Sequence, residues 1–210
     1  MDIGCGEGAN TRQLAKLGAS MTGIDISPTF IKHASEFSDG PPIDYRLGDG
    51  TRLEFSDASF DFTTAFMSLM DMPDQQKALA EAFRATKPGG FLQFSILHPC
   101  FVPSRRRTVR DEKGIATGVL ISDYFTETNG DVERWHFSVL TEKQRNAIAP
   151  FAVPRFHRTL ATWVGYLCKA GWIIEEFCEP RATPEIAEIN EIVADTLLTP
   201  IFLIVRARKT

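Results

Sequence analysis

Cysteine is scarce in this sequence, and its spacing matches neither a metal site nor a disulfide framework. The four cysteines are scattered along the 210 residues, and no two of them form a CxxC pair: Cys5, Cys100, Cys168 and Cys178. No cluster of cysteine and histidine has the spacing of zinc ligands. We therefore expect no metal centre, and a reduced, cytoplasmic protein is the simplest interpretation.

Long apolar runs and a basic excess are also lacking. No run approaches the roughly 18 residues of a membrane span, and no basic-then-apolar leader is present, so we expect neither a span nor secretion. The 23 Lys and Arg against 27 Asp and Glu give a net charge of −4, which argues against a nucleic-acid-binding surface. With 43% hydrophobic and 24% charged residues, the composition is globular, and the length suits one ordinary domain or one domain with an insertion.

Short apolar runs alternate with helical patterns in the first half of the chain. After a short strand at the first three residues, we expect strands over 20–25, 43–47, 60–67 and 91–97. Helical spacing of apolar residues predicts helices over 11–17, 28–37 and 75–86. Five strands separated by helices or other connections predict a parallel, doubly wound α/β sheet.

Residues 98–157 break this alternation. Asn129-Gly130 lies between two stretches of β character, 119–128 and 131–140, and Asn-Gly in that setting is the strongest short hairpin signal. A connection of this length far exceeds the usual α/β loop, so we expect an insertion that serves as a lid or binding element. Further helices and strands follow, and we interpret 1–210 as a single domain that contains this insertion.

A glycine-rich turn, Gly4-Cys5-Gly6-Glu7-Gly8, follows the first strand and opens the first helix. In a β-turn-α unit, glycines let the backbone approach a ligand, and the helix amino end offers free N–H groups. The turn fits the loose dinucleotide pattern G-x-G-x-x-A, with Asp25 about twenty residues further on to hold a ribose. It also fits D-x-G-x-G-x-G, and either match alone is weak.

The second pattern resembles motif I of the class I S-adenosylmethionine-dependent methyltransferases. Three further features stand in the family's order and spacing: Asp25 at the end of the second strand, Asp49 after the third, and Lys87-Pro88-Gly89-Gly90 before the fifth. The resemblance covers nearly the whole chain and is closest to the small-molecule type 11 group, which includes ubiquinone and menaquinone C-methyltransferases. It implies a seven-stranded Rossmann-like sheet of order 3-2-1-4-5-7-6, mostly parallel, with the last strand antiparallel.

The resemblance also implies S-adenosylmethionine as the cofactor and S-adenosylhomocysteine as the product. The turn would lie against the methionine and ribose, Asp25 would accept the ribose hydroxyls, and Asp49 would face the adenine amino group. The implied cofactor-binding residues are Asp2, Gly4, Gly6, Gly8, Asp25, Ile26, Asp49, Gly50, Phe66, Met67 and Ser68. The structural alternatives are a tight turn for the glycines, a strand-end carboxylate for Asp25 and a turn-forming Asp49.

Candidates for acceptor chemistry follow the fifth strand, at the carboxyl end of the sheet where such folds bind ligands. A neutral His98 there could act as a catalytic base, and a turn histidine stacked on Phe101 is an equal alternative. The candidates for binding an aromatic or lipid-like substrate are Tyr124, Trp135, Phe137 and His157. A hairpin core, a homodimer contact or, for His157, a helix cap would explain them equally well or better. The basic run 105–107 with Arg110 is either a solvated loop or a site for a substrate carboxylate or phosphate.

Three functions are compatible with these sequence patterns. The leading one is methyl transfer to O, N or C of a small molecule, with no nucleic-acid partner. A protein that binds S-adenosylmethionine without turnover and a nucleotide-cofactor oxidoreductase are the alternatives. Members of the family that this chain resembles usually carry one or two helices before motif I. None precedes the turn here, so we expect either a truncation or a start codon assigned too late. We also expect a more open cofactor site, unless a second chain or the hairpin covers it.

Overall fold

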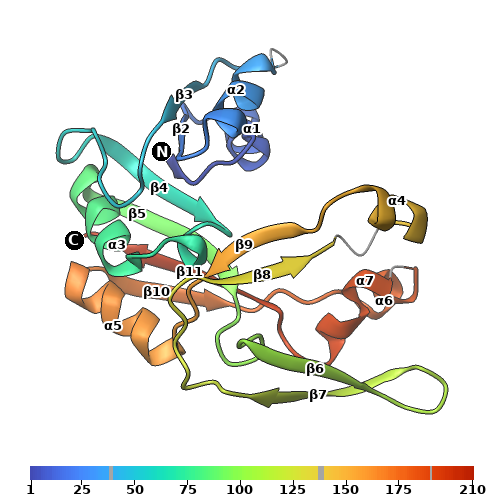
Figure 1. Cartoon of the computed structure of the whole chain (residues 1–210). Coiled ribbons are helices and arrows are strands. Elements are labelled where there is room, and N and C mark those ends of the chain that lie inside the picture. The colour runs from blue at the N-terminus through green and yellow to red at the C-terminus, as the bar shows by residue number, and fades with distance from the viewer. Residues whose placement is uncertain (38–39, 137–139, 190) are drawn as a thin grey trace. The chain divides into compact units, whose positions relative to one another are not determined.

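The computed structural model, which describes residues 1–37, 40–136, 140–189 and 191–210, contains one seven-stranded sheet (Figure 1). The sheet strands are β1 (Asp2–Ile3), β2 (Thr22–Asp25), β3 (Asp44–Leu47), β4 (Phe60–Phe66), β5 (Thr86–Leu97), β10 (Ile173–Cys178) and β11 (Phe202–Arg208). Their spatial order is β10-β11-β5-β4-β1-β2-β3. This confirms the predicted order 3-2-1-4-5-7-6, because β10 and β11 are the sixth and seventh strands of the sheet along the chain.

The strand directions also agree with the prediction. Strands β1 to β5 are joined in parallel pairs, whereas β10 and β11 pair antiparallel. The helices between the first strands are α1 (Ala9–Lys16), α2 (Pro28–Glu36) and α3 (Gln75–Ala85), with the short helix η1 (Leu69–Asp71) after β4. Helix α2 begins as predicted, because the Ser27 hydroxyl accepts a hydrogen bond from the Phe30 N–H and a proline occupies the first turn.

Helices α3 and α5 (Leu160–Ala170) cover the same face of the sheet. Phe94 of β5 packs against Trp163 of α5, with ring centroids 5.8 Å apart. Trp172, which follows α5, lies edge-on to Phe83 of α3 at 5.1 Å and donates its indole N–H to the Leu79 carbonyl at 3.1 Å. This packing buries the β5 side chains on that face completely and forms the main core.

The chain divides into two compact units, which we call the sheet unit and the insertion unit. The sheet unit comprises residues 1–96, 161–178 and 204–210, and the insertion unit comprises residues 97–160 and 179–203. The elements of the insertion unit are β6 (Arg105–Arg110), β7 (Ala116–Ser122), β8 (Asp131–Trp135), α4 (Glu142–Ala147), β9 (Phe151–Arg155), α6 (Pro184–Ile189), α7 (Glu191–Ala194) and η2 (Asp195–Leu197). Among the described residues, no helix combines the length and the apolar character needed to cross a membrane.

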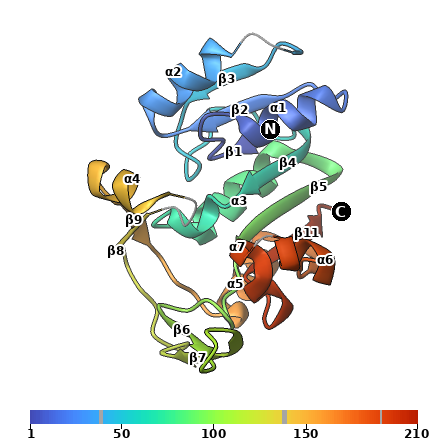
Figure 2. The same ribbon diagram turned by 90° about the vertical axis from the view of Figure 1, so that its right-hand side faces the viewer.

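The hairpin predicted at Asn129-Gly130 is wrong, although the insertion unit does contain a hairpin. Strand β7 pairs antiparallel with β6, and β8 pairs antiparallel with β9, so the segments on either side of Asn129-Gly130 have different partners (Figures 1 and 2). The turn that closes β6 and β7 is organised by Asp111, whose carboxylate accepts the N–H groups of Lys113 and Ile115 at 2.9 Å. Gly130, with φ +99°, instead leads the chain into β8 and donates its N–H to the Arg155 carbonyl.

Candidate functional site

The glycine-rich turn joins β1 to α1 in a conformation that only glycine adopts easily. Gly4, Gly6 and Gly8 have φ angles of +69°, +55° and +85°. The Cys5 N–H donates to the Ile24 carbonyl at 2.9 Å, and the Gly8 N–H donates to the Cys5 carbonyl at 3.0 Å. The turn is therefore fixed to β2 and closes on itself before the helix starts.

The three glycines have different surroundings. A Cβ atom on Gly4 would collide with Ser68, and a Cβ atom on Gly8 would collide with the Tyr45 hydroxyl. A Cβ atom on Gly6 would have no heavy atom within 4 Å. The turn thus has packed sides at Gly4 and Gly8 and an open side at Gly6, where a ligand can approach the backbone.

Asp25 ends β2 beside this turn. Its Oδ2 atom accepts the Gly6 N–H at 2.8 Å, and its Oδ1 atom accepts the Ser27 N–H at 2.9 Å. A carboxylate oxygen has more than one lone pair, so each oxygen can accept a further hydrogen bond. Asp25 can therefore hold the turn and still accept two vicinal hydroxyls. The next side chain, Ile26, is 73% exposed.

Asp49 and Gly50 lie at the end of the neighbouring strand. The Gly48 N–H donates to the Asp25 carbonyl at 2.9 Å, which keeps the ends of β2 and β3 together. Asp49 Oδ1 accepts both the N–H and the hydroxyl of Thr51 at 2.8 Å. Within the described chain, Oδ2 accepts no side-chain or backbone donor. A Cβ atom on Gly50 would collide with Ile3, so this glycine is required by packing.

The end of β4 completes this edge of the sheet. The Ser68 hydroxyl donates to the Ile3 carbonyl at 2.6 Å, directly beside Gly4. Met67 has φ +54°, and its N–H donates to the Ser95 carbonyl at 2.9 Å. A non-glycine residue in this conformation costs about 1–3 kcal/mol, and such residues cluster at functional sites. The structure therefore brings Phe66–Ser68 to the same edge as the turn, Asp25 and Asp49.

Asp2 is placed differently from the other cofactor candidates. It is 2% exposed, and its carboxylate accepts the hydroxyls of Thr11 at 2.6 Å and Thr64 at 2.8 Å. Burial raises the pKa of this carboxyl, against the effect of the two hydrogen bonds. Asp2 therefore joins β1 to α1 and β4 from inside the fold.

His98, in the insertion unit, is 3% exposed and has partners at both ring nitrogens. Its Nδ1 atom accepts the Cys100 N–H at 3.1 Å, and its Nε2 atom lies 2.9 Å from Glu179 Oε1. Because a backbone N–H only donates, the Nδ1 lone pair is occupied and Nε2 carries the proton toward Glu179. The ring also lies edge-on to Phe101 at 4.9 Å, as expected for a packed turn histidine.

Tyr124 and His157 lie together in the same unit. The Tyr124 hydroxyl accepts the Leu160 N–H at 3.0 Å and lies 3.9 Å from Cys100 Sγ. His157 Nε2 donates to the Tyr124 carbonyl at 2.9 Å, and burial lowers the pKa of this histidine. Cys100 thus contacts both His98 and Tyr124, and Tyr124 in turn contacts His157. Trp135 ends β8, and Phe137 lies outside the described residues.

Sequence reasoning missed Tyr45 and Arg12, which lie directly behind the turn. Tyr45 is the register partner of Gly23 on β2, and a Cβ atom on Gly23 would collide with its ring. A glycine inside a strand indicates a close neighbour, so Gly23 was the available signal. No comparable local signal marked Arg12, because arginine is common on helix surfaces.

Comparisons with known proteins show similarity to methyltransferases. Residues 1–94 match the methyltransferase domain family Methyltransf_11. The demethylmenaquinone methyltransferase of Renibacterium salmoninarum is 38% identical over 108 residues, which are 50% of this chain and 44% of that protein. The enzyme of the same name from Tropheryma whipplei is 34% identical over 145 residues, 65% of this chain and 59% of that protein. The matches to these curated relatives thus span less than two thirds of their length.

A solved structure extends the likeness over the whole fold. The S-adenosylmethionine-dependent methyltransferase of Mesorhizobium loti superposes with a TM-score of 0.76 at 27% sequence identity. The superposition covers 99% of this chain and 89% of that one. The fold of this chain is therefore similar to that of a solved methyltransferase over nearly its whole length.

Proposed function

We propose that this chain is a class I S-adenosylmethionine-dependent methyltransferase and that it transfers a methyl group to a small-molecule acceptor. The observation that carries the proposal is the open side of Gly6 beside Asp25, whose two oxygens retain acceptor capacity. The comparisons give no support to a nucleotide-cofactor oxidoreductase or to a binding protein without turnover.

The residues of the sheet unit fit S-adenosylmethionine. Asp25 would accept the two ribose hydroxyls, Asp49 Oδ2 would accept the adenine amino group, and Ile26 would cover the adenine with its exposed side chain. The backbone at Gly6 would lie against the cofactor, with Phe66–Ser68 near its methionine portion. When bound, the cofactor supplies an activated methyl group, so the protein's tasks are to position the reactants and exclude water.

We further propose an aromatic acceptor of quinone type. Relatives are named for demethylmenaquinone and for 2-methyl-6-phytyl-1,4-hydroquinone, both of which carry such a ring. We assign acceptor binding to the insertion unit, with the candidates Tyr124, Trp135, Phe137 and His157. His98 would serve there by orienting Glu179, since its own lone pair is occupied. The free cysteines support a cytoplasmic location as part of the same proposal.

Calorimetric titration with S-adenosylhomocysteine, with NAD as the control ligand, tests the cofactor assignment. We expect binding of S-adenosylhomocysteine and no response to NAD. Transfer of a labelled methyl group from S-adenosylmethionine to demethylmenaquinone-like and simple phenolic acceptors then tests turnover. Binding without transfer to any acceptor would favour the alternative of a binding protein, and binding of NAD alone would exclude the proposed function.

A further inference from the structure

Two side chains hold the glycine-rich turn from behind. Arg12, in α1, donates from Nη1 to the Glu7 carbonyl at 2.5 Å and from Nη2 to Glu7 Oε2 at 2.6 Å. Tyr45, on β3, donates its hydroxyl to the Gly8 carbonyl at 3.4 Å. The acceptors of these bonds belong to Glu7 and Gly8, the two residues that follow Gly6. The bonds therefore hold the chain directly next to the glycine whose Cβ position is open.

The Tyr45 ring also fills the space behind the turn. Cβ atoms on Gly8 and on Gly23 would both collide with this ring, so the backbones of the turn and of β2 rest against it. Packing of this density lets a backbone move away from the ring but not toward it. The ring therefore limits how far the turn can retreat from a ligand on its open side.

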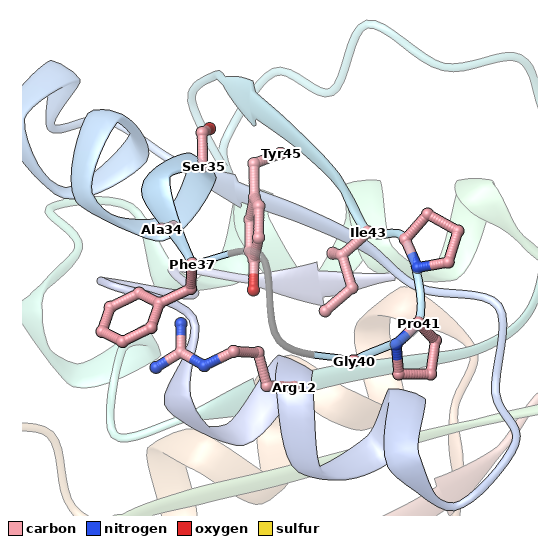
Figure 3. A pocket seen from close by; sticks show the side chains of 9 residues that line it. Arg12, Ala34, Ser35, Phe37, Gly40, Pro41, Ile43 and Tyr45 are labelled. Atoms are coloured by element: carbon pink, nitrogen blue, oxygen red, sulfur yellow. The ribbon is translucent and has the colours of Figure 1, made fainter.

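The far sides of Arg12 and Tyr45 border a cavity rather than tightly packed side chains. This cavity has a volume of about 330 Å³, and Arg12, Phe37 and Tyr45 are among the residues that line it (Figure 3). The Arg12 guanidinium lies 4.1 Å from the centroid of the Phe37 ring, and Figure 3 shows the Tyr45 hydroxyl directed to the same side of the cavity as Arg12. Within the part of the chain that the structure describes, these two side chains are held by Glu7, Gly8 and Phe37 and by their interaction with each other.

We propose that Arg12 and Tyr45 are positioning residues for the cofactor, because they hold Glu7 and Gly8 so that the Gly6 backbone is presented in its binding conformation. This inference rests on the proposed function. A turn that must be reordered when the cofactor arrives binds it more weakly, since part of the binding free energy is used for ordering. Loss of the contacts should raise the Kd and the KM for the cofactor and leave kcat at saturation unchanged.

Replacement of Arg12 by glutamine tests the first contact, and Arg84 offers a matched control. Arg84 makes the same kind of contact elsewhere in the sheet unit, donating to the carbonyls of Leu53 and Phe55 and to the carboxylates of Asp57 and Glu81. We expect Arg12→Gln to raise the Kd for S-adenosylhomocysteine by about 10-fold, the size of one charged hydrogen bond. Arg84→Gln should lower the melting temperature at least as much but leave the Kd unchanged.

Two variants separate the hydroxyl of Tyr45 from its ring. Tyr45→Phe keeps the ring and removes the hydroxyl, with its long bond to Gly8 and its interaction with Arg12, and should change the Kd less than about 3-fold. Tyr45→Ala removes the support behind Gly8 and Gly23 and should raise the Kd about 10-fold or more. The phenylalanine variant thus serves as a conservative rescue. Wild-type affinity in folded Arg12→Gln and Tyr45→Ala would overturn the proposal, as would a fall in kcat with unchanged KM.

Amide hydrogen exchange of residues 4–8 gives a readout that needs no cofactor. Exchange should be faster in Arg12→Gln than in the wild-type protein and unchanged in Arg84→Gln. If the wild-type protein binds no S-adenosylhomocysteine, the proposed function fails while this measurement still tests the positioning role. Equal exchange in all three proteins would overturn the positioning role by itself.

Discussion

Replacement of Gly6 by alanine should separate cofactor binding from folding. At φ +55° an alanine carries the left-handed penalty of about 1–2 kcal/mol, offset by about 0.4–1 kcal/mol because alanine has less freedom than glycine in the unfolded chain. No steric term is added, since a Cβ atom here has no neighbour within 4 Å. We therefore expect a net loss of about 1 kcal/mol, or about 2–4 °C in melting temperature for a chain of this size.

The effect on the cofactor should be much larger. The same Cβ atom would stand on the open side of the turn, in the space that the proposed cofactor needs for close contact with the backbone. We expect the Kd for S-adenosylhomocysteine to rise by about 100-fold or more, equivalent to about 2.7 kcal/mol. Calorimetric titration measures this rise, and thermal unfolding measures the small stability loss in the same samples.

Gly18→Ala is the matched control for this variant. Gly18 follows α1 and has φ +98°, and a Cβ atom added to it would likewise have no heavy atom within 4 Å. This variant should lose a similar amount of stability and keep the wild-type Kd. Equal Kd values for the two alanine variants would refute the assignment of the Gly6 side as the cofactor side.

Three further predictions follow from the carboxylates and from one histidine. Asp25→Asn should raise the Kd for S-adenosylhomocysteine more than about 10-fold, because the amide group cannot accept hydrogen bonds at both of its ends, and titration of the folded variant measures this. Because the pKa of Asp2 is raised, the folded state binds its proton more tightly than the unfolded state does, and the free energy of unfolding should fall as pH rises above 3.8, the ordinary pKa of this carboxyl. Denaturant unfolding at several pH values should show that Asp2→Asn lacks this fall. The lowered pKa of His157 has the opposite effect on stability: the free energy of unfolding should fall as pH drops below 6.5, the ordinary pKa of histidine. His157→Gln, which can still donate to the Tyr124 carbonyl, should remove that loss in thermal unfolding experiments, and an unchanged pH profile would contradict the assignment.

The parts of the site that sequence reasoning recovered are those that local chemistry determines. Three positive φ angles within five residues require glycines, and a carboxylate at a strand end can bond the N–H groups of a nearby turn. These features leave a pattern in neighbouring residues. The turn and Asp25 were identifiable in this way, whereas Asp49 and the sheet order followed from the family resemblance. The structure brings all three to one edge of the sheet.

The parts that sequence reasoning missed depend on partners far away in the chain. Asn129-Gly130 gives a local hairpin signal. The pairing of β7 with β6 and of β8 with β9 depends instead on the contacts along the full length of each strand. Glu179, the partner of His98, could not be inferred because it lies 81 residues further on. Tyr45 was missed for the same reason, since its contact with Gly8 spans 37 residues.

The position of β11 has a consequence for the order of folding. This strand lies between β5 and β10, and Arg208 donates to the Gly89 carbonyl across 119 residues of sequence. Strands β1 to β4 can pair through much shorter loops, whereas β5 keeps an unpaired edge until β11 arrives. An open edge with apolar side chains is a template for association between chains. Substitutions on the buried face of β11, at Leu203, Val205 or Ala207, should therefore promote aggregation during refolding more than their cost in final stability suggests.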